Sequence, residues 1–420
     1  MIKNVLYAQS GGVTPVINAQ AAAVIETASL HPDKIGKLYA GRNGIIGVLR
    51  EELIDISAEP EQNLQLLAQT PAGAFGSCRY KLKSIKESPA EYQRLLEVFQ
   101  AHNIGYFFYN GGGDSQDTTN KIAQYCQEMG YPVTCIGVPK TIDNDLPLTD
   151  NSPGFGSVAK YVAVSILEAG LDVQAMAASS TKVFIMEVMG RHTGWIAAAA
   201  GLAAQQADQA PHIILLPEVA FDPIKFCARV KQAVTDYGYC AIVASEGIRT
   251  NDGKFLAAAN SKDMFGHTQL GGVAPQLADI VQRELGYKYH WAVCDYLQRA
   301  ARHIASQIDL DHAYATGKAA VEFALAGKNA VMPIIVRDSN SPYKWHIEAA
   351  ALQDIANTEK FLPKEFISAD GFGITTRCRE YLLPLIAGEA YPQYAQGLPV
   401  YARLQNNLVT KKLLEYAIND

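Results

Sequence analysis

The sequence lacks an excess of positive charge, a hydrophobic run long enough to cross a membrane, and a visible secretion signal. Its 420 residues carry 36 lysines and arginines against 42 aspartates and glutamates, a net charge of −6. This balance argues against a broadly basic surface for nucleic acid. The longest apolar candidate, Trp195 to Ala204, is soon followed by Gln205 and Gln206, so we expect no membrane-spanning helix. The first residues are typical of a strand, and we expect a cytoplasmic location.

Cysteine patterns typical of disulfides or zinc sites are also missing. The seven cysteines are odd in number and widely spaced, and no Cys-x-x-Cys pair occurs. We therefore expect reduced, buried thiols, as in cytoplasmic proteins. The sequence also has no Gly-x-x-x-x-Gly-Lys-Ser/Thr loop, no Gly-x-Gly-x-x-Gly fingerprint after its first strand, and no Gly-x-Ser-x-Gly or His-Glu-x-x-His motif. The best-known nucleotide-loop, dinucleotide, hydrolase and zinc-protease signatures are therefore excluded.

Short apolar runs alternate with helical patterns along the chain. The runs are almost continuously apolar, which is typical of parallel strands covered by helices on both faces. They are Val5–Ala8, Tyr106–Tyr109, Val133–Val138, Val183–Val188, Ile213–Leu216 and Ala241–Ala244. Helical patterns begin near Ser115 and near Ser157. The sequence predicts a layered α/β protein with two sheets that share strands from distant parts of the chain, at least one of them doubly wound.

Glycine-rich segments follow two of these strands, at the strand ends where ligands bind in such sheets. The first is QSGGVTP, from Gln9, and the second is YNGGGDS, from Tyr109. Glycine lets backbone N–H groups approach an anion, and a following helix adds a favourable dipole. For the first segment, a structural turn and a phosphate loop are equally good interpretations. The second segment favours a phosphate loop, with Asp114 as a candidate ligand of Mg²⁺.

The segment PKTIDND, from Pro139 to Asp145, gathers two carboxylates, an amide, a hydroxyl and a lysine just past another strand. Asp143 could take a proton from a substrate hydroxyl. Lys140 could neutralise a phosphoryl group during its transfer. An exposed turn is the less favoured interpretation, because a structural turn does not require this density of charge beside a buried strand.

Three later segments supply weaker candidates. Arg191, in EVMGRHTG, offers a planar fork for phosphate or sugar oxygens. The adjacent His192 has no evident partner in the sequence, which favours a structural role. Glu246 follows another strand and could bind sugar hydroxyls, and Tyr296 and Arg299, in YLQR, could hold a phosphate.

The ordered set SGG, GGGDS, PKTIDND, MGR, SEG and YLQR resembles the phosphofructokinase superfamily. The match runs from Gly11 to about Gly327, and PKTIDND followed by EVMGR is highly specific. The later segments DGFGIT and GEAYP resemble the longer branch, which uses pyrophosphate. ATP-using members usually carry glycine at the positions of Asp114 and Lys140. The resemblance implies that Asp114 fills the space of the α-phosphate of ATP and that Lys140 stabilises the transferring group.

The resemblance implies reversible, Mg²⁺-dependent transfer of a phosphoryl group from pyrophosphate to the 1-hydroxyl of fructose 6-phosphate, in glycolysis or gluconeogenesis. Asp143 would be the base, with Lys140 and Asp114 as further catalytic residues and Asp114 as the metal ligand. The implied donor-binding residues are Gly12, Arg79 and Gly113. The implied substrate-binding residues are Thr141, Ile142, Asp143, Lys182, Met189, Gly190, Arg191, Glu246, Tyr296, Leu297, Gln298 and Arg299.

Two positions depart from the family pattern, and a third implies that the protein forms an oligomer. Many members have a second metal-binding aspartate at the position of Gly113, so Asp114 would serve both tasks. A family arginine has no clean match, and Lys288 or His290 would replace it. Lys182 stands where the family often has an arginine that reaches a neighbouring subunit's substrate, which implies a homodimer or a homotetramer.

The resemblance also implies a phosphofructokinase-like fold of two interlocked Rossmann-like, three-layer α/β/α domains with a C-terminal helical extension. Residues 1–155, with part of about 298–345, would bind the donor; residues 156–297, with part of about 346–420, would bind fructose 6-phosphate. Two alternatives stay open: an ATP-dependent enzyme of this fold, and a non-catalytic regulator that binds sugar phosphates. The Asp143/Asp145 pair argues against the regulator, because binding alone requires no base.

Overall fold

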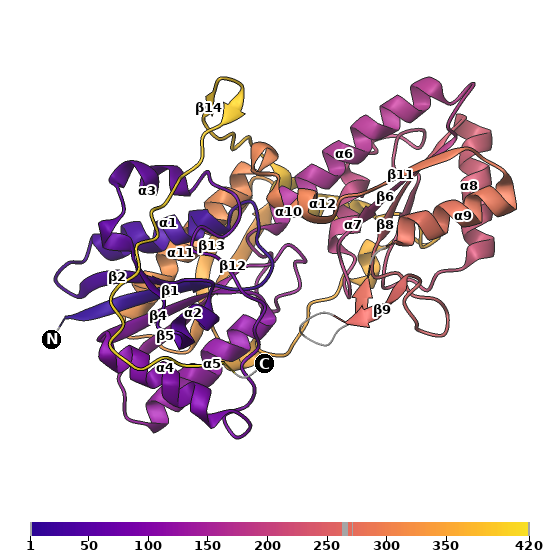
Figure 1. The fold of residues 1–420 in the computed structure, drawn as a ribbon. Coiled ribbons are helices and arrows are strands. Elements are labelled where there is room, and N and C mark those ends of the chain that lie inside the picture. Colours follow the sequence, from indigo (N-terminus) through magenta and orange to yellow (C-terminus); the bar gives the residue numbers. More distant parts are fainter. Residues whose placement is uncertain (1, 263–267, 271, 419–420) are drawn as a thin grey trace.

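Two lobes, each built on its own β-sheet, make up the molecule (Figure 1). The computed structural model describes residues 2–262, 268–270 and 272–418. All six apolar runs that were predicted as strands lie in strands, with at most one residue of a run outside its strand, and the predicted α/β class is confirmed. No helix in the described part of the chain is both long enough and apolar enough to cross a bilayer.

The first lobe contains a seven-stranded sheet in the order β13-β12-β5-β4-β1-β2-β3. Its central strands are parallel, whereas β3 and β13 pair in an antiparallel manner at the two edges. Strands β12 and β13 return to this sheet after the chain has built the second lobe. The strands are β1 (Lys3–Gln9), β2 (Ile35–Gly41), β3 (Leu53–Asp55), β4 (Ile104–Gly111), β5 (Thr134–Pro139), β12 (Val331–Asn340) and β13 (Tyr343–Ala351).

Helices cover both faces of this sheet, because successive side chains of its strands point to opposite faces. In β1, Val5 and Tyr7 pack under α1 and α11, whereas Leu6 and Ala8 pack under α2, α4 and α5. The helices of this lobe are α1 (Ile17–Ser29), α2 (Ile45–Leu49), α3 (Glu61–Leu67), α4 (Pro89–Ala101), α5 (Gly113–Glu128) and α11 (Gln307–Leu325).

The second lobe contains a four-stranded parallel sheet in the order β11-β6-β8-β7. Helices α6 and α7 pack on one face, and α8 and α9 pack on the other. The strands are β6 (Val183–Val188), β7 (Ile213–Leu215), β8 (Cys240–Ser245) and β11 (Tyr289–Val293), with a separate pair, β9 (Ala258–Lys262) and β10 (Thr268–Leu270). The helices are α6 (Phe155–Met176), α7 (Trp195–Ala199), α8 (Pro223–Tyr237), α9 (Val273–Leu285) and α10 (Asp295–Ala300).

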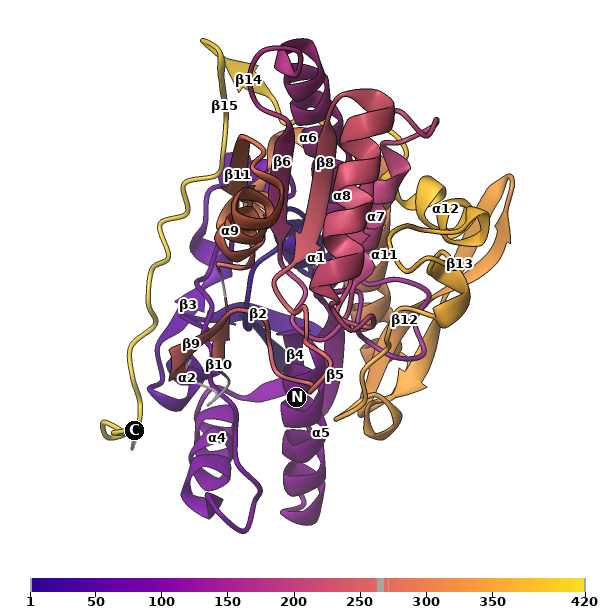
Figure 2. The same cartoon turned by 90° about the vertical axis from the view of Figure 1, so that its right-hand side faces the viewer.

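The helices of the C-terminal extension end at Ile386, and the remaining chain is largely extended. The extension contains α12 (Thr376–Leu382) and a short pair, β14 (Tyr394–Ala395) and β15 (Leu398–Pro399). The tail then runs along the first lobe (Figures 1 and 2). Short 3₁₀ helices lie at Ile56–Ala58, Ala200–Leu202, Arg302–Ile304, Leu352–Asp354, Lys364–Phe366 and Leu383–Ile386.

Two carboxylates of the first lobe hold this tail. Glu51 accepts hydrogen bonds from the backbone N–H groups of Lys412 (2.6 Å) and Leu413 (3.0 Å). Glu59 accepts from the N–H groups of Gln405 (2.9 Å) and Asn406 (2.6 Å). The tail is therefore an ordered part of the lobe although it forms no helix.

Candidate active site

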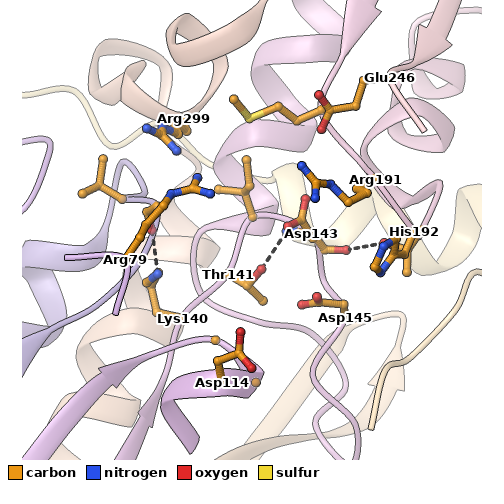
Figure 3. Close-up of a pocket in the computed structure, with 18 of the residues that line it drawn as sticks. Arg79, Asp114, Lys140, Thr141, Asp143, Asp145, Arg191, His192, Glu246 and Arg299 are labelled. Carbon is orange, nitrogen blue, oxygen red and sulfur yellow. Dashed lines mark hydrogen bonds between the residues drawn. The ribbon is translucent and has the colours of Figure 1, made fainter. Parts of the chain in front are cut away.

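A cleft of about 780 Å³ is lined by loops from both lobes. These loops follow the carboxyl ends of β1, β4, β5, β6 and β8, which is where ligands bind in open α/β sheets. The structure brings together most of the predicted site residues (Figure 3). The predicted residues in the wall of the cleft are Gly12, Arg79, Gly113, Asp114, Lys140, Thr141, Ile142, Asp143, Met189, Arg191, Glu246, Tyr296 and Arg299.

The side chain of Lys140 joins two of the loops of the first lobe. Its Nζ donates hydrogen bonds to the carbonyl oxygens of Ser10 (2.7 Å) and Gly12 (2.6 Å). Its backbone N–H donates to the carbonyl of Gly111 (3.1 Å), so the loop after β4 is tied to the same point. The residue is 3% exposed. This arrangement holds a buried amine beside the glycine-rich loops.

The glycines of the loop after β1 allow close approach of charged side chains. A Cβ atom on Gly12 would lie 2.7 Å from Nη1 of Arg299. The N–H of Gly11 donates to the carbonyl of Cys78 (2.9 Å), and the hydroxyl of Ser77 donates to the carbonyl of Gly11 (2.8 Å). These bonds fix the segment that carries Arg79. The glycine pair therefore lines the cleft, where a binding loop would have to lie.

Asp114 lies in the first turn of α5, where the helix dipole favours anions. Its carboxylate forms an ion pair with Nζ of Lys81 at 2.6 Å, and both side chains are partly exposed. Within the described residues, no group of three or more His, Cys, Asp or Glu side chains could hold a metal ion. One carboxylate facing the cleft fits a cation that is bound mainly through substrate phosphates, which is how Mg²⁺ commonly binds beside polyphosphates.

Asp143 lies near the middle of the cleft, with Arg79 and Arg299 on one side and Arg191 on the other (Figure 3). Its N–H donates to Oγ1 of Thr141 (3.0 Å). Burial, together with the neighbouring carboxylates of Asp145 and Glu246, raises the pKa of Asp143 to about 7. A carboxylate with a pKa near neutrality is well suited to act as a general base.

Burial changes the pKa of Lys140 in the opposite direction. Desolvation, with the positive charge of Arg299 nearby, lowers the pKa of Lys140 to about 7. The free site thus holds an amine and a carboxyl group that both titrate near neutral pH. Perturbed groups of this kind, gathered in a cleft, are typical of catalytic sites.

The second lobe supplies polar groups that could bind a sugar phosphate. Oε1 of Glu246 accepts a hydrogen bond from the N–H of Gly190 at 3.4 Å, and burial raises the pKa of this carboxyl group. The guanidinium of Arg299 stacks over the ring of Tyr296, 3.8 Å from its centroid. This stacking fixes a cation at the rim of the cleft, between the two lobes.

Four predicted residues do not line the cleft. Lys182 precedes the amino end of β6, and its ammonium donates to the carbonyl of Ala177. The side chain of Leu297 points to the surface. Gln298 is buried and supports the wall indirectly, because its Oε1 accepts from the N–H of Met189 at 3.3 Å. Gly190 has a φ of +131°, which favours glycine, and makes the turn between Met189 and Arg191, which do line the cleft.

Sequence reasoning missed three charged residues of this region. Glu187 and Asp295 line the cleft, and Lys81 pairs with Asp114. Glu187 is the last residue but one of strand β6, so its place near a carboxyl strand end was a usable signal. The position of Lys81 depends on the path of the loop between Gly76 and the helix α4, and the sequence offers no pattern that predicts it.

The comparisons with known proteins agree with this geometry. The sequence model of the family "Phosphofructokinase" matches residues 4–324. The chain is 61% identical to the pyrophosphate–fructose 6-phosphate 1-phosphotransferase of Methylococcus capsulatus, covering 98% of each chain. It is 60% identical to the protein of the same name from Halomonas elongata, covering 99% of each. Cleft, fold and sequence together place the chain in the phosphofructokinase family, to which it belongs.

A solved structure supports the same assignment. The crystal structure of the pyrophosphate-dependent phosphofructokinase of Marinobacter aquaeolei superposes with a TM-score of 0.92, at 60% identity, and the match covers 99% of this chain and 100% of that one. The phosphofructokinase-like fold predicted from the sequence is therefore confirmed.

Proposed function

We propose that the protein transfers a phosphoryl group from pyrophosphate to the 1-hydroxyl of fructose 6-phosphate, releasing phosphate and fructose 1,6-bisphosphate. The observation that carries this proposal is the buried amine of Lys140, 2.6 Å from the carbonyl of Gly12, beside Asp143 and Asp114. The relatives at about 60% identity carry the same activity in their names.

The chemistry follows from the positions of these groups. Asp143 accepts the proton of the 1-hydroxyl as the new P–O bond forms and the bond to the leaving phosphate breaks. Lys140 stabilises the negative charge of the transferring group, and Arg79 contacts the donor. Glu246, Arg191 and Arg299 orient the sugar phosphate. Positioning and electrostatic stabilisation are the main contributions that a protein makes to phosphoryl transfer.

We propose Mg²⁺ as the metal of this reaction, as in the general use of divalent cations by this family. Asp114 would hold it together with the phosphates of the donor. When bound, the ion supplies positive charge that offsets the negative charge of pyrophosphate. We further propose that the lobe of the seven-stranded sheet binds the donor and the other lobe binds the sugar phosphate.

We also propose a homodimer or a homotetramer in the cytoplasm. Strand β11 forms an edge of its sheet and exposes Trp291 and Val293, and Leu297 follows nearby at 66% exposure. Exposed apolar side chains at a sheet edge favour pairing with another chain. Lys182 would then reach the substrate of a neighbouring subunit. The free thiols support a reducing compartment, and light scattering on the purified protein would measure the assembly.

An assay with each donor tests the main proposal. Purified protein should turn over fructose 6-phosphate with Mg²⁺ and pyrophosphate, and turnover with ATP alone would establish the ATP-dependent alternative. Asp143→Asn should lower kcat by about 10²–10⁴-fold while calorimetry still detects binding of fructose 6-phosphate. The exposed Asp172→Asn is the control. Retained turnover in Asp143→Asn would show that the base is another group.

A further inference from the structure

A segment of the C-terminal extension, residues 358–362, lies against the loop that carries Asp143. The N–H of Lys360 donates to the carbonyl of Asp145 at 2.7 Å. The carbonyl of Lys360 accepts from Nε1 of Trp195, at the start of α7, at 3.0 Å. This segment lies beyond residues 4–324, the part of the chain that the family model matches. It therefore connects the loop that carries Asp143, in one lobe, with α7 in the other lobe.

The side chain of Lys360 adds a second set of contacts to the same loop. Its ammonium donates to the carbonyl oxygens of Asp150 (2.8 Å) and Thr149 (3.0 Å), and to Oδ1 of Asn144 (3.3 Å). An ammonium group has three N–H donors, and here the acceptors all come from one loop. The amine thus holds the two ends of the segment from Asn144 to Asp150 together.

Asn144, between Asp143 and Asp145, adopts a conformation that needs such support. Its φ is +54°, in the left-handed region that residues other than glycine seldom adopt. Its side chain is fully buried, with Oδ1 accepting from the N–H of Ser152 (3.0 Å) and Nδ2 donating to the hydroxyl of Tyr381 (3.1 Å). A strained backbone persists when its surroundings over-determine it. Two of the residues that contact the side chain of Asn144, Lys360 and Tyr381, belong to the C-terminal extension.

The same segment also contacts the opposite wall of the cleft. Oε1 of Glu359 lies 2.9 Å from Nδ1 of His192, a residue of the loop after β6. Oγ1 of Thr193, the next residue, donates to the carbonyl of Asp143 at 3.2 Å. The extension therefore meets both sides of the site at one short stretch of chain.

We infer that Lys360 is a positioning residue for phosphoryl transfer, which holds Asn144 and thereby sets the orientation of Asp143. This inference rests on the proposed function. Without the amine, Asn144 loses one of the contacts that maintain its positive φ, and the carbonyls of Thr149 and Asp150 lose a donor. A displacement of a reacting group by about 1 Å lowers the rate by about 10²-fold.

Replacing Lys360 with methionine tests the inference. We expect kcat to fall by about 10²-fold, while KM for fructose 6-phosphate and the binding stoichiometry measured by calorimetry stay close to those of the wild type. Lys160→Met is the matched control, because the ammonium of Lys160 likewise holds the extension, through Gly388 (2.7 Å) and Glu389 (2.6 Å), but away from the loop that carries Asp143. This control should lose stability and keep its kcat per folded molecule. Equal losses of kcat in both variants would overturn the inference.

A double-mutant comparison separates positioning from general stability. If Lys360 acts through Asp143, adding Lys360→Met to Asp143→Asn should cause little further loss of the residual rate. A further loss as large as that seen in the single variant would contradict the inference. Asn144→Ala serves if Lys360→Met does not fold, because it removes the Oδ1 acceptor of Lys360 and disfavours a positive φ, and it should show the same loss of kcat. Unchanged kcat in Asn144→Ala would also refute the inference.

The wild-type assay distinguishes this inference from the proposed function. A wild type that uses ATP and not pyrophosphate would refute the donor assignment. The ratio of kcat between Lys360→Met and the wild type, measured with whichever donor is active, would still decide the role of Lys360.

Discussion

Replacing Lys140 with methionine tests whether its ammonium stabilises the transferring phosphoryl group. Two of the three N–H donors of the ammonium are taken by Ser10 (2.7 Å) and Gly12 (2.6 Å), which leaves one for a phosphoryl oxygen. Methionine has a similar length and no charge, so the buried packing is largely kept. Removing one preorganised donor from such a site costs about 2.7–4 kcal/mol, or about 10²–10³-fold in kcat.

The activity of the wild type should also depend on pH, because Asp143 and Lys140 must each be in one protonation state to act. Asp143 acts as a carboxylate, and burial raises its pKa to about 7, so activity should fall as the pH drops below that value. Lys140 acts as an ammonium, and burial lowers its pKa to about 7, so activity should fall as the pH rises above that value. The plot of kcat/KM against pH should therefore be a narrow bell with its maximum near neutrality.

Lys140→Met should change both sides of this bell. The alkaline fall should disappear with the amine. The acid fall should move to higher pH, because the charge of Lys140 lowers the pKa of Asp143 and would no longer do so. Initial rates with saturating Mg²⁺, from about pH 5 to about pH 9, would measure this, with the exposed Lys225→Met as control. An unchanged alkaline fall, or a kcat equal to that of the control, would refute the reasoning.

Two further predictions concern the donor and the tail. Asp114→Gly combined with Lys140→Gly should sharply lower the rate with pyrophosphate, and unchanged pyrophosphate kinetics would remove the argument for that donor. Glu51→Gln should lower the free energy of unfolding by about 3 kcal/mol, because the buried carboxylate lies 2.7 Å from His102 and holds the tail. Thermal and urea unfolding would measure it against the exposed Glu61→Gln, and an equal effect in both variants would contradict it.

Six strands of the two sheets could be predicted from the sequence because burial on two faces leaves a simple pattern. The run Val5–Ala8 sends its side chains into two different cores, so every position is apolar. The edge strand β13 (Tyr343–Ala351) has instead a half-exposed, alternating pattern with polar residues. Its hydrophobic signal is weaker, and no apolar run marked it in the sequence.

Most of the site was predictable for a topological reason. Loops at the carboxyl ends of parallel strands lie at the same edge of a sheet, so Gly12, Asp114 and Lys140 had to come close together once β1, β4 and β5 were parallel neighbours. The role of each residue could not be predicted from its position alone, because spacing does not distinguish a phosphate loop from a tight turn.

The contacts made by the C-terminal extension were not predictable. In the tail, Leu404 and Leu413 pack against the first lobe, whereas Leu408 and Leu414 are exposed. Nothing in the sequence around Lys360 predicts that its amine lies beside Asn144, more than 200 residues earlier in the chain. Such contacts depend on how distant segments pack, and no local pattern of charge or periodicity records them.

Lys140 and Asp143, whose pKa values both lie near 7, line the same cleft between the lobes. Burial destabilises the charged forms of both Lys140 and Asp143, so the free site holds each near its titration point. In the proposed mechanism an anionic donor beside Lys140 would stabilise the ammonium, and the cations Arg191 and Arg299 line the same cleft. Anionic substrates would by themselves raise the pKa of Asp143. The positive charges of Lys140 and Arg79 lower it, so in the proposed mechanism these two cations keep the base ionised when the phosphates are bound.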